Sequence, residues 1–212
     1  MKIAVVGGTG AGGRRVVDEV ARSGHEAVVV GRSAGVDLLT GAGLDAALAG
    51  CAAVVDVSNS PGWSRDEAEP LSTRGTGNLL DASARAGVRH LVVLSIVGAD
   101  EVDLDYYFGK RRQEALVMAG SVPWSVLRTT RPPEPAAGSP ACVTGPVAPS
   151  VSSQPVSSLP MSPPPVSAAD VAARLIELAV GRPQGFVLPV AGPDRPGVGE
   201  GTFAGCRDGV CP

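Results

Sequence analysis

Aromatic side chains are scarce in this chain. They make up 3% of its 212 residues, although apolar residues as a whole reach 44%. The core must therefore be built from aliphatic side chains. The length is enough for one domain of good size and too short for two comfortable ones.

An excess of positive charge is also missing. Lys and Arg number 18 against 21 Asp and Glu, which gives a net charge of −3. Such a chain has no basic field to attract nucleic acid or an anionic membrane surface. No apolar run is long enough to cross a bilayer. We therefore expect neither a nucleic acid nor a membrane among its partners.

The sequence has no metal-binding or disulfide pattern either. Its four cysteines, at positions 51, 142, 206 and 211, form no Cys-x-x-Cys pair, and His25 and His90 are isolated. This spacing supports neither a zinc site nor a disulfide framework. We interpret Cys51 as a small buried hydrophobic residue, expect no metal, and expect a reducing, cytoplasmic location.

What the chain does contain is an alternation of short β-branched apolar runs with helical patterns. The runs predicted as strands are 3–6, 27–30, 52–57, 90–94, 124–127 and, last, the stretch GFVLPVAGP at 185–193. Helices are predicted from the glycines to Gly24, and over 44–48, 77–86, 107–119 and 167–181, the last capped by Ser167. This alternation predicts an α/β fold, a doubly wound parallel sheet with right-handed crossovers and helices on both faces.

The stretch GGTGAGG, residues 7–13, has five glycines in seven positions and lies between the first predicted strand and the first helix. A linker would instead be flanked by polar, aperiodic sequence. Gly8, Gly10 and Gly13 match G-x-G-x-x-G, while Gly7, Gly10 and Gly13 match G-x-x-G-x-x-G. Glycine permits a sharp turn and a close backbone approach to a pyrophosphate, and the helix N-terminus offers unpaired N–H groups. We favour a dinucleotide site over a purely structural turn.

The second predicted strand is followed by Arg32 and Ser33. A fold specific for NAD often has an acidic residue here that binds the ribose 2′-hydroxyl. A guanidinium suits a 2′-phosphate instead, through its charge and forked geometry. We therefore predict NADP rather than NAD, with a solvated surface arginine as the alternative interpretation of Arg32.

These segments, in this order, resemble the atypical short-chain dehydrogenase/reductases, in particular the NmrA-like NAD(P)-binding proteins and their quinone-reductase relatives. The matching stretches are VVGGTGAGG, VVGRS, GVDLLTGAGLDAALAGCAAVVDVSN, GTGNLLDASARAGVRHLVVLSIVGAD, YYFGKRRQEALV and VPWSVLR. They cover residues 1–128 almost without a gap, and SAADVAARLIELAVG resembles a later helix of such proteins. The resemblance implies a Rossmann-type NAD(P)-binding core over residues 1–130. Residues 131–212 would be a Pro- and Ser-rich substrate-side region that completes the same domain.

The resemblance also implies a set of cofactor contacts. The pyrophosphate would be held by Gly7, Thr9, Gly10, Ala11, Gly12 and Gly13. The adenosine ribose and adenine would contact Arg32, Ser33, Asp37 and Leu38, and the cofactor would be lined by Val57, Ser58 and Asn59. Asp37 fits a loop carboxylate that caps a turn equally well.

Three further residues could carry chemistry. Ser95 ends a predicted strand at the carboxyl edge of the sheet, and Tyr106 and Lys110 form Y-x-x-x-K, which places both on one helix face. In the related dehydrogenases the lysine holds the nicotinamide ribose, the tyrosine donates a proton and the serine steadies the substrate oxygen. Lys110 could instead be a surface lysine. We interpret Tyr106 first as a packing aromatic and Ser95 first as a cofactor-lining residue.

The chain departs from the resemblance after VLR. Relatives continue there with a hydrophobic, often aromatic stretch, whereas this chain has TTRPPEPAAGSP. Residues 132–165 hold eleven prolines and seven serines, which predicts a long loop over the site or a mobile segment. The last residues, GEGTFAGCRDGVCP, stand where relatives carry a further helix. We hypothesise a truncated or altered C-terminal end, as from a reading-frame slip, which resequencing would test.

Three functions fit these observations. The first is an NADPH-dependent reductase that transfers hydride to a quinone or carbonyl substrate. The second is a non-catalytic NADP(H) sensor that acts through a protein partner. A weaker third is a sugar-nucleotide epimerase, for which the chain is short. Oxidation of NADPH by a panel of quinones and aldehydes would separate the first two.

Overall fold

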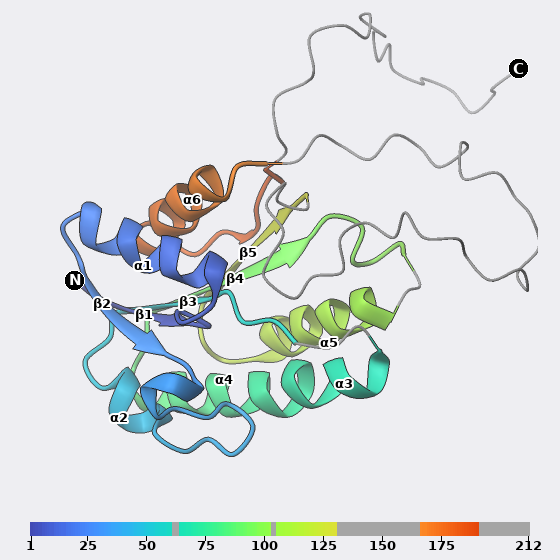
Figure 1. The fold of residues 1–212 in the computed structure, drawn as a ribbon, viewed down its shortest axis with the longest axis horizontal. Helices are drawn as coiled ribbons and strands as arrows, with labels where there is room; N and C mark the ends of the chain where they lie inside the picture. Colours follow the sequence, from blue (N-terminus) through green and yellow to red (C-terminus); the bar gives the residue numbers. More distant parts are fainter. Residues whose placement is uncertain (61–63, 103–104, 131–165, 191–212) are drawn as a thin grey trace, which may run out of the picture.

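Six parallel strands form one sheet in the computed structural model, which describes residues 1–60, 64–102, 105–130 and 166–190. The strand order is β2-β1-β3-β4-β5-β6 (Figure 1). The strands are β1 (Lys2–Val6), β2 (Glu26–Val30), β3 (Ala53–Asp56), β4 (His90–Ile96), β5 (Trp124–Thr129) and β6 (Gly185–Phe186). Every recorded pairing is parallel, as the strand–helix alternation predicts.

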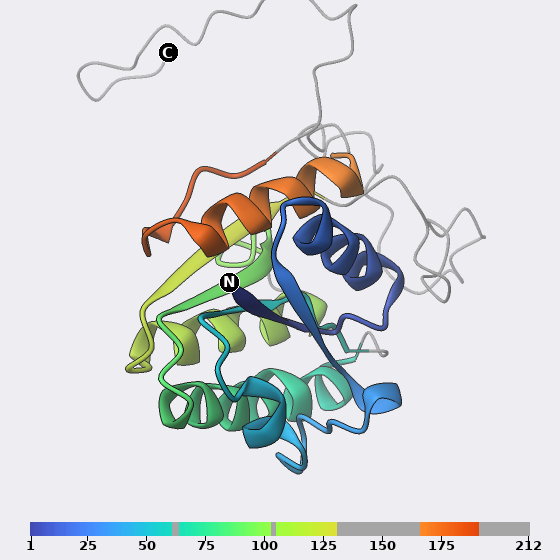
Figure 2. The same ribbon diagram turned by 90° about the vertical axis from the view of Figure 1, so that its left-hand side faces the viewer.

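Helices cover both faces of this sheet (Figures 1 and 2). One face carries α1 (Ala11–Arg22) and α6 (Ala168–Val180), and the other carries α2 (Leu44–Leu48), α4 (Thr76–Arg85) and α5 (Asp105–Ala119). Successive side chains of a strand point to opposite faces, so each strand feeds two cores. In β1, Ile3 and Val5 pack with α1 and α6, whereas Ala4 and Val6 pack on the other side. The predicted doubly wound α/β fold is confirmed.

One helical stretch was not predicted. Helix α3 (Arg65–Pro70) runs into a π-helical segment, Leu71–Gly75, and then into α4. Ser64 begins it with a capping box, in which its hydroxyl accepts from the Glu67 amide and its own amide donates to the Glu67 carboxylate. The pattern Ser-x-x-Glu is readable in the sequence as a helix start but was not used, and the helix contains Pro70 near its end.

The C-terminal part of the sheet is shorter than predicted. Strand β6 spans two residues, and Val190 forms only an isolated bridge with Thr129. Pro189 lies between them and has no N–H to donate, so the ladder cannot continue. Helix α6 is capped as predicted, because the Ser167 hydroxyl accepts from the Ala169 amide. The predicted proline-rich loop at 132–165 and the tail from 192 lie outside the described residues.

The order of the strands creates a topological switch point, where open α/β sheets have their ligand-binding crevice. From β1 the chain moves outward to β2, and it then returns past β1 to β3 on the other side. Such a reversal leaves the carboxyl ends of β1 and β3 without a crossover between them, and open α/β sheets bind ligands at that point. We call the carboxyl ends of β1 and β3, with the loops that follow them, the switch-point crevice.

Candidate functional site

The glycine loop, residues 7–13, lies against the loop after β3. Gly7 has φ +79°, and a Cβ at this position would lie 2.9 Å from Ser58 Cα. Gly7 also donates its N–H to the Val30 carbonyl at 2.9 Å. This single residue therefore touches the ends of both neighbouring strands, which no residue with a side chain could do.

Two further glycines of the loop are fixed by close packing. A Cβ on Gly13 would lie 2.0 Å from the Gly7 carbonyl oxygen, and one on Gly8 would lie 2.9 Å from the Val5 oxygen. Both glycine registers that fit the sequence therefore contain residues that must be glycine. The packing draws the start of α1 tightly against the turn.

The opening turn of α1 is suited to an anion. Gly10 is its N-cap and offers no side-chain hydrogen bond, and the first turn holds no acidic residue. A helix N-terminus leaves its first N–H groups without intrahelical partners and carries a partial positive charge. Gly12 has open space around the position of its missing Cβ, with no heavy atom within 4 Å. Gly10 and Gly12 therefore leave the backbone of this turn uncovered by side chains of their own.

The end of β2 lies beside the same loop. A Cβ on Gly31 would be 2.9 Å from the Thr9 hydroxyl oxygen. Arg32 follows directly and begins a single 3-10 turn, Arg32–Ala34, in which it and Ser33 are exposed. The fold thus brings an exposed guanidinium and the glycine loop to the same edge of the sheet.

Asp37 and Leu38 are engaged within the protein. Asp37 Oδ1 accepts from the Leu39 amide at 2.8 Å, so this carboxylate caps a turn, one of the two roles expected for it. Leu38 packs against the apolar core, and its carbonyl oxygen accepts from Asn78 Nδ2 at 2.7 Å. The structure places this pair beyond the end of β2 without assigning it a ligand.

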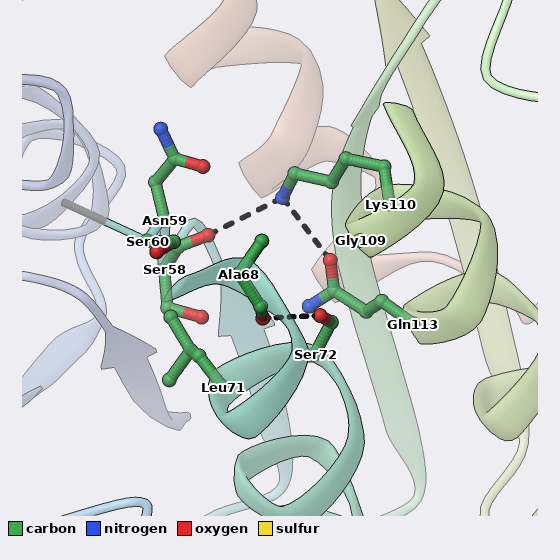
Figure 3. A pocket seen from close by; sticks show the side chains of 9 residues that line it. All are labelled: Ser58, Asn59, Ser60, Ala68, Leu71, Ser72, Gly109, Lys110 and Gln113. Carbon is green, nitrogen blue, oxygen red and sulfur yellow. Dashed lines mark hydrogen bonds between the residues drawn. The ribbon is translucent and has the colours of Figure 1, made fainter. Parts of the chain in front are cut away.

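A small pocket opens at the carboxyl ends of β3 and β4 (Figure 3). Three segments line it: the loop after β3, the α3 and π-helical stretch, and α5. Gly109 lets the two helical segments approach, because a Cβ there would lie 3.1 Å from Ala68 Cβ. The lining residues are Ser58, Asn59, Ser60, Ala68, Leu71, Ser72, Gly109, Lys110 and Gln113. Val57 is half-buried and packs on the α1 and α6 side of the sheet.

Lys110 crosses this pocket from α5. Its Nζ donates to the Ser58 carbonyl at 3.3 Å and to Gln113 Oε1 at 3.1 Å (Figure 3). It also donates to the Leu94 carbonyl at 3.1 Å. The three protons of the ammonium therefore have three acceptors, at the ends of β3 and β4 and on α5 itself. Burial lowers the pKa of Lys110, and the charges of Asp56 and Glu114 oppose that change.

Of the other two residues predicted to take part in the chemistry, the structure describes the side chain of Ser95 but not that of Tyr106. Ser95 is buried near the end of β4, and its hydroxyl has no hydrogen-bond partner among the described residues. Tyr106 belongs to α5, one turn before Lys110, but its side chain lies outside the described set. Ser95 and Lys110 thus share the carboxyl edge of β4, and the position of the tyrosine ring stays a prediction.

Two residues of this site were missed by the sequence analysis. Asp56 ends β3 at 2% exposure, and Gln113 lies one turn after Lys110 at 4% exposure. Gln113 Nε2 donates to Asp56 Oδ2 at 2.9 Å, and Asp56 Oδ1 accepts from the Ser58 amide at 2.8 Å. Burial raises the pKa of Asp56, while its hydrogen bonds and Lys110 oppose that change. A lone carboxylate at the end of the apolar run AAVVD was the readable signal.

The residues that the structure describes offer neither a metal site nor a membrane-spanning helix. No cluster of three His, Cys, Asp or Glu side chains there could hold a metal ion. None of the helices in those ranges is both long and apolar enough to span a bilayer.

Comparison with known proteins gives one family and several relatives. A model of a family described as NAD(P)H-binding matches residues 34–180. The (4-alkanoyl-5-oxo-2,5-dihydrofuran-3-yl)methyl phosphate reductase of Streptomyces griseus is 34% identical over 140 residues, 59% of this chain and 46% of that enzyme. The chain thus spans about half the length of the curated relative it matches.

Solved structures show the same fold. A putative NAD-dependent epimerase/dehydratase from Bacillus halodurans superposes with a TM-score of 0.67 at 20% identity, over 92% of this chain and 96% of the other. A short-chain dehydrogenase/reductase superfamily protein from Agrobacterium tumefaciens with bound NAD gives a TM-score of 0.52 at 26% identity, over 62% and 49%. The predicted NAD(P)-binding, short-chain dehydrogenase/reductase-like character is confirmed, and the narrower NmrA-like assignment stays a prediction.

Proposed function

The chain belongs to the NAD(P)H-binding family, and from that premise we propose that it is an NADPH-dependent reductase that delivers hydride to an electron-poor carbonyl compound. The observation that carries this proposal is the placement of Lys110. Its ammonium lies at the carboxyl ends of β3 and β4, on the same sheet edge as the glycine loop. A reducing coenzyme and a cation that orients it would thus share one crevice.

The backbone of the glycine loop fits a dinucleotide. At Gly7 and Gly13 any Cβ would collide with neighbouring backbone, and the start of α1 is free of acidic side chains. We assign the pyrophosphate to this loop, with Thr9, Gly10, Ala11 and Gly12 completing the contact. Val57, Ser58 and Asn59 would line the other side of the crevice.

Arg32 supports a preference for the phosphorylated coenzyme. Its guanidinium is exposed at the position after β2 where dinucleotide folds distinguish the ribose 2′-hydroxyl from the 2′-phosphate. Ser33 follows it and could donate to the same phosphate. We expect Arg32→Ala to weaken NADPH binding by about tenfold or more, the loss of one charge-assisted pair, with little change for NADH.

The matched control for this substitution is Arg89→Ala. Arg89 is also exposed, but it lies before β4, at the amino edge of the sheet. It should leave both affinities unchanged. Equal weakening of NADPH and NADH binding by Arg32→Ala would contradict the assigned role, as would equal affinity of the wild type for the two coenzymes.

The chemical step would use the residues around the nicotinamide end of the crevice. NADPH, when bound, supplies hydride. Lys110 would orient the adjoining ribose, and the buried Ser95 hydroxyl, which lacks a partner among the described residues, would donate to the substrate oxygen. Tyr106 is the proposed proton donor, assisted by the positive charge of Lys110.

The Streptomyces griseus relative suggests the class of substrate. Its name describes a lactone ring whose double bond is conjugated to the ring carbonyl and to an alkanoyl group. Hydride addition to the β-carbon and protonation of the α-carbon would saturate such a bond. Quinones also have carbon–carbon double bonds that are conjugated to carbonyl groups and therefore accept hydride. We therefore propose a conjugated carbonyl compound or quinone as the substrate of this chain.

Two observations are also consistent with the alternative functions, a coenzyme sensor and a sugar-nucleotide epimerase. All three protons of the Lys110 ammonium already have acceptors within the protein, which also suits a coenzyme sensor that acts through a protein partner. The similarity to an NAD-dependent epimerase/dehydratase keeps a sugar-nucleotide epimerase as the weaker alternative. A cytoplasmic location stays a prediction under all three.

The deciding experiment measures NADPH oxidation with an alkanoyl butenolide phosphate, a quinone and an aldehyde, together with NADPH binding. A reductase should turn over at least one of them and lose about a hundredfold of that rate in Lys110→Met. Arg89→Ala should match the wild type. Tight NADPH binding without turnover of any compound would favour the sensor, and conversion of a UDP-sugar would favour the epimerase.

A further inference from the structure

A chain of buried polar groups leads away from Lys110. Its Nζ donates to Gln113 Oε1 at 3.1 Å, and Gln113 Nε2 donates in turn to Asp56 Oδ2 at 2.9 Å. The second carboxylate oxygen accepts from the Ser58 amide at 2.8 Å. Figure 3 shows the Gln113 amide turned with its oxygen toward Lys110. The ammonium is thus connected to the end of β3 through one amide.

The hydrogen-bonding character of these groups fixes the direction of the chain. An ammonium can only donate, and an ionised carboxylate can only accept. The link between them must therefore accept at one end and donate at the other, which a carboxamide does and neither an aliphatic side chain nor a carboxylate can do. Since Asp56 and Gln113 are both almost fully buried, solvent cannot replace either partner.

Burial disfavours the charged forms of both Lys110 and Asp56, so each ion needs hydrogen-bond partners within the protein. Burial lowers the pKa of Lys110 and raises that of Asp56, so both ions are less stable here than in water. Besides Asp56 on β3, the charged group that acts on Lys110 is Glu114 on α5, which is bound in a bidentate pair to Arg128. Asp56 is thus the carboxylate whose link to Lys110 the amide completes.

We infer that Gln113 is a positioning residue. Through its hydrogen bonds to both groups, the buried Asp56 carboxylate would fix the position of the Lys110 ammonium. Lys110 would then meet the coenzyme already charged and held in place. This inference rests on the proposed function, since it concerns how the coenzyme-binding lysine is prepared. Gln113 itself need not touch coenzyme or substrate.

The test compares Gln113→Glu with Gln113→Met in NADPH titrations across a range of pH. A protonated glutamic acid reproduces the amide, because its carbonyl accepts from Lys110 and its O–H donates to Asp56. An ionised glutamate faces Asp56 with like charge and cannot donate. Gln113→Glu should therefore bind NADPH as the wild type does at acidic pH and lose about tenfold in affinity as the pH rises through the pKa of the new carboxyl.

The controls separate positioning from folding. Gln113→Met, which has no polar atoms for the link, should bind about tenfold more weakly at every pH. Ala115→Glu places a carboxyl on an exposed position of the same helix and should follow the pH profile of the wild type. Gln113→Met could fail to fold. In that case the NADPH affinity of Gln113→Glu decides alone, because the same variant is compared with itself at acidic and at higher pH.

The results of these titrations separate the role of Gln113 from the proposed function. A wild type that binds NADPH, alongside a Gln113→Glu variant with wild-type affinity at every pH, would overturn the role of Gln113 and leave the proposed function standing. A folded wild type that binds neither NADPH nor NADH would overturn both. Recovery of affinity on protonation of Gln113→Glu alone would support the inference.

Discussion

Gly12 and Gly13 are neighbours in the first turn of α1, yet their surroundings differ sharply. A Cβ on Gly13 would lie 2.0 Å from the Gly7 carbonyl oxygen, whereas one on Gly12 would meet no heavy atom within 4 Å. We predict that Gly13→Ala lowers the free energy of unfolding by about 1–3 kcal/mol through overpacking. Gly12→Ala should raise it by up to about 1 kcal/mol through helix propensity.

Urea denaturation of the two variants checks this prediction. The pair is matched, because both substitutions add one methyl group to adjacent positions of the same helix. Equal effects on the midpoint would show that the close approach of α1 to the glycine loop is not a constraint on Gly13.

His90 is the second residue for which we predict a measurable effect, here on the pH dependence of the free energy of unfolding. It is buried at the start of β4, where Nε2 lies 2.9 Å from the Ser125 hydroxyl oxygen, which also accepts from the Gln184 amide. Burial lowers the pKa of His90 in the folded chain, so unfolded chains bind the proton first as the pH falls. The contribution of His90 to stability should be complete above about pH 6.5 and decline below it.

Denaturation of the wild type and His90→Gln at several pH values measures this contribution as a difference. The difference is needed because Asp56 acts in the opposite sense: burial raises its pKa, so its ionisation favours the unfolded chain as the pH rises. His25→Gln, which changes the other histidine of the sequence, is the control. An unchanged pH profile in His90→Gln would refute the prediction.

At this scale the sequence identified the residues whose type is unusual in context. The glycines, Arg32 and Ser95 were singled out because each adjoins or ends an apolar strand, and Lys110 because it forms Y-x-x-x-K with Tyr106; their roles stay predictions. Asp56 and Gln113 were not, because their partnership joins residues 57 positions apart. Only the packing of α5 over the end of β3 brings them together.

At the scale of elements, α5 is anchored to the sheet by an ion pair. Arg128 on β5 forms two hydrogen bonds with Glu114 on α5, at 3.0 and 2.8 Å, and a third with Asp100 at 2.9 Å. The Glu114 side chain is 6% exposed and that of Arg128 is 19% exposed. This anchor also fixes the helix that carries Lys110.

We predict that Arg128→Lys lowers the free energy of unfolding by about 2–3 kcal/mol. A lysine cannot reproduce the forked contact, and a largely buried carboxylate would lose partners. The control is Arg85→Lys, in an equally short pair with Asp45 whose side chains are 60% and 68% exposed. That change should cost less than about 1 kcal/mol, because solvent screens the pair. Similar losses in both variants, measured by urea denaturation, would contradict the argument from burial.

Element boundaries followed from periodicity where strands and helices were apolar and uninterrupted. Helix α2 was predicted to the residue, and β1 and α6 to within a residue or two. Helix α3 was missed because its Ser-x-x-Glu capping signal was not used and the short segment has no apolar periodicity. Strand β6 was predicted too long because Pro189 interrupts its ladder.

At the scale of the whole molecule, the order of the strands determines where a ligand can bind. The return of the chain from β2 past β1 to β3 places the carboxyl ends of β1 and β3 side by side without a crossover, and the glycine loop contacts the Ser58 segment there. The alternation of strands and helices predicted a doubly wound parallel sheet with right-handed crossovers, whereas the order of the strands comes from the structure. For residues 132–165 the proline-rich sequence has no periodicity from which to predict an element, and their proposed role on the substrate side stays a prediction.

The proposed function depends on binding of the coenzyme's pyrophosphate at the N-terminus of α1, and substitution of Gly12 tests this binding. Gly12→Asp adds a carboxylate where the helix has no acidic residue, which should maintain or raise the thermal midpoint of the free protein. The same charge should repel a pyrophosphate and weaken NADPH binding by about tenfold or more relative to the neutral Gly12→Asn. Equal NADPH affinity of the folded Asp and Asn variants would contradict the claim, as would a folded wild type with no affinity for NADPH or NADH.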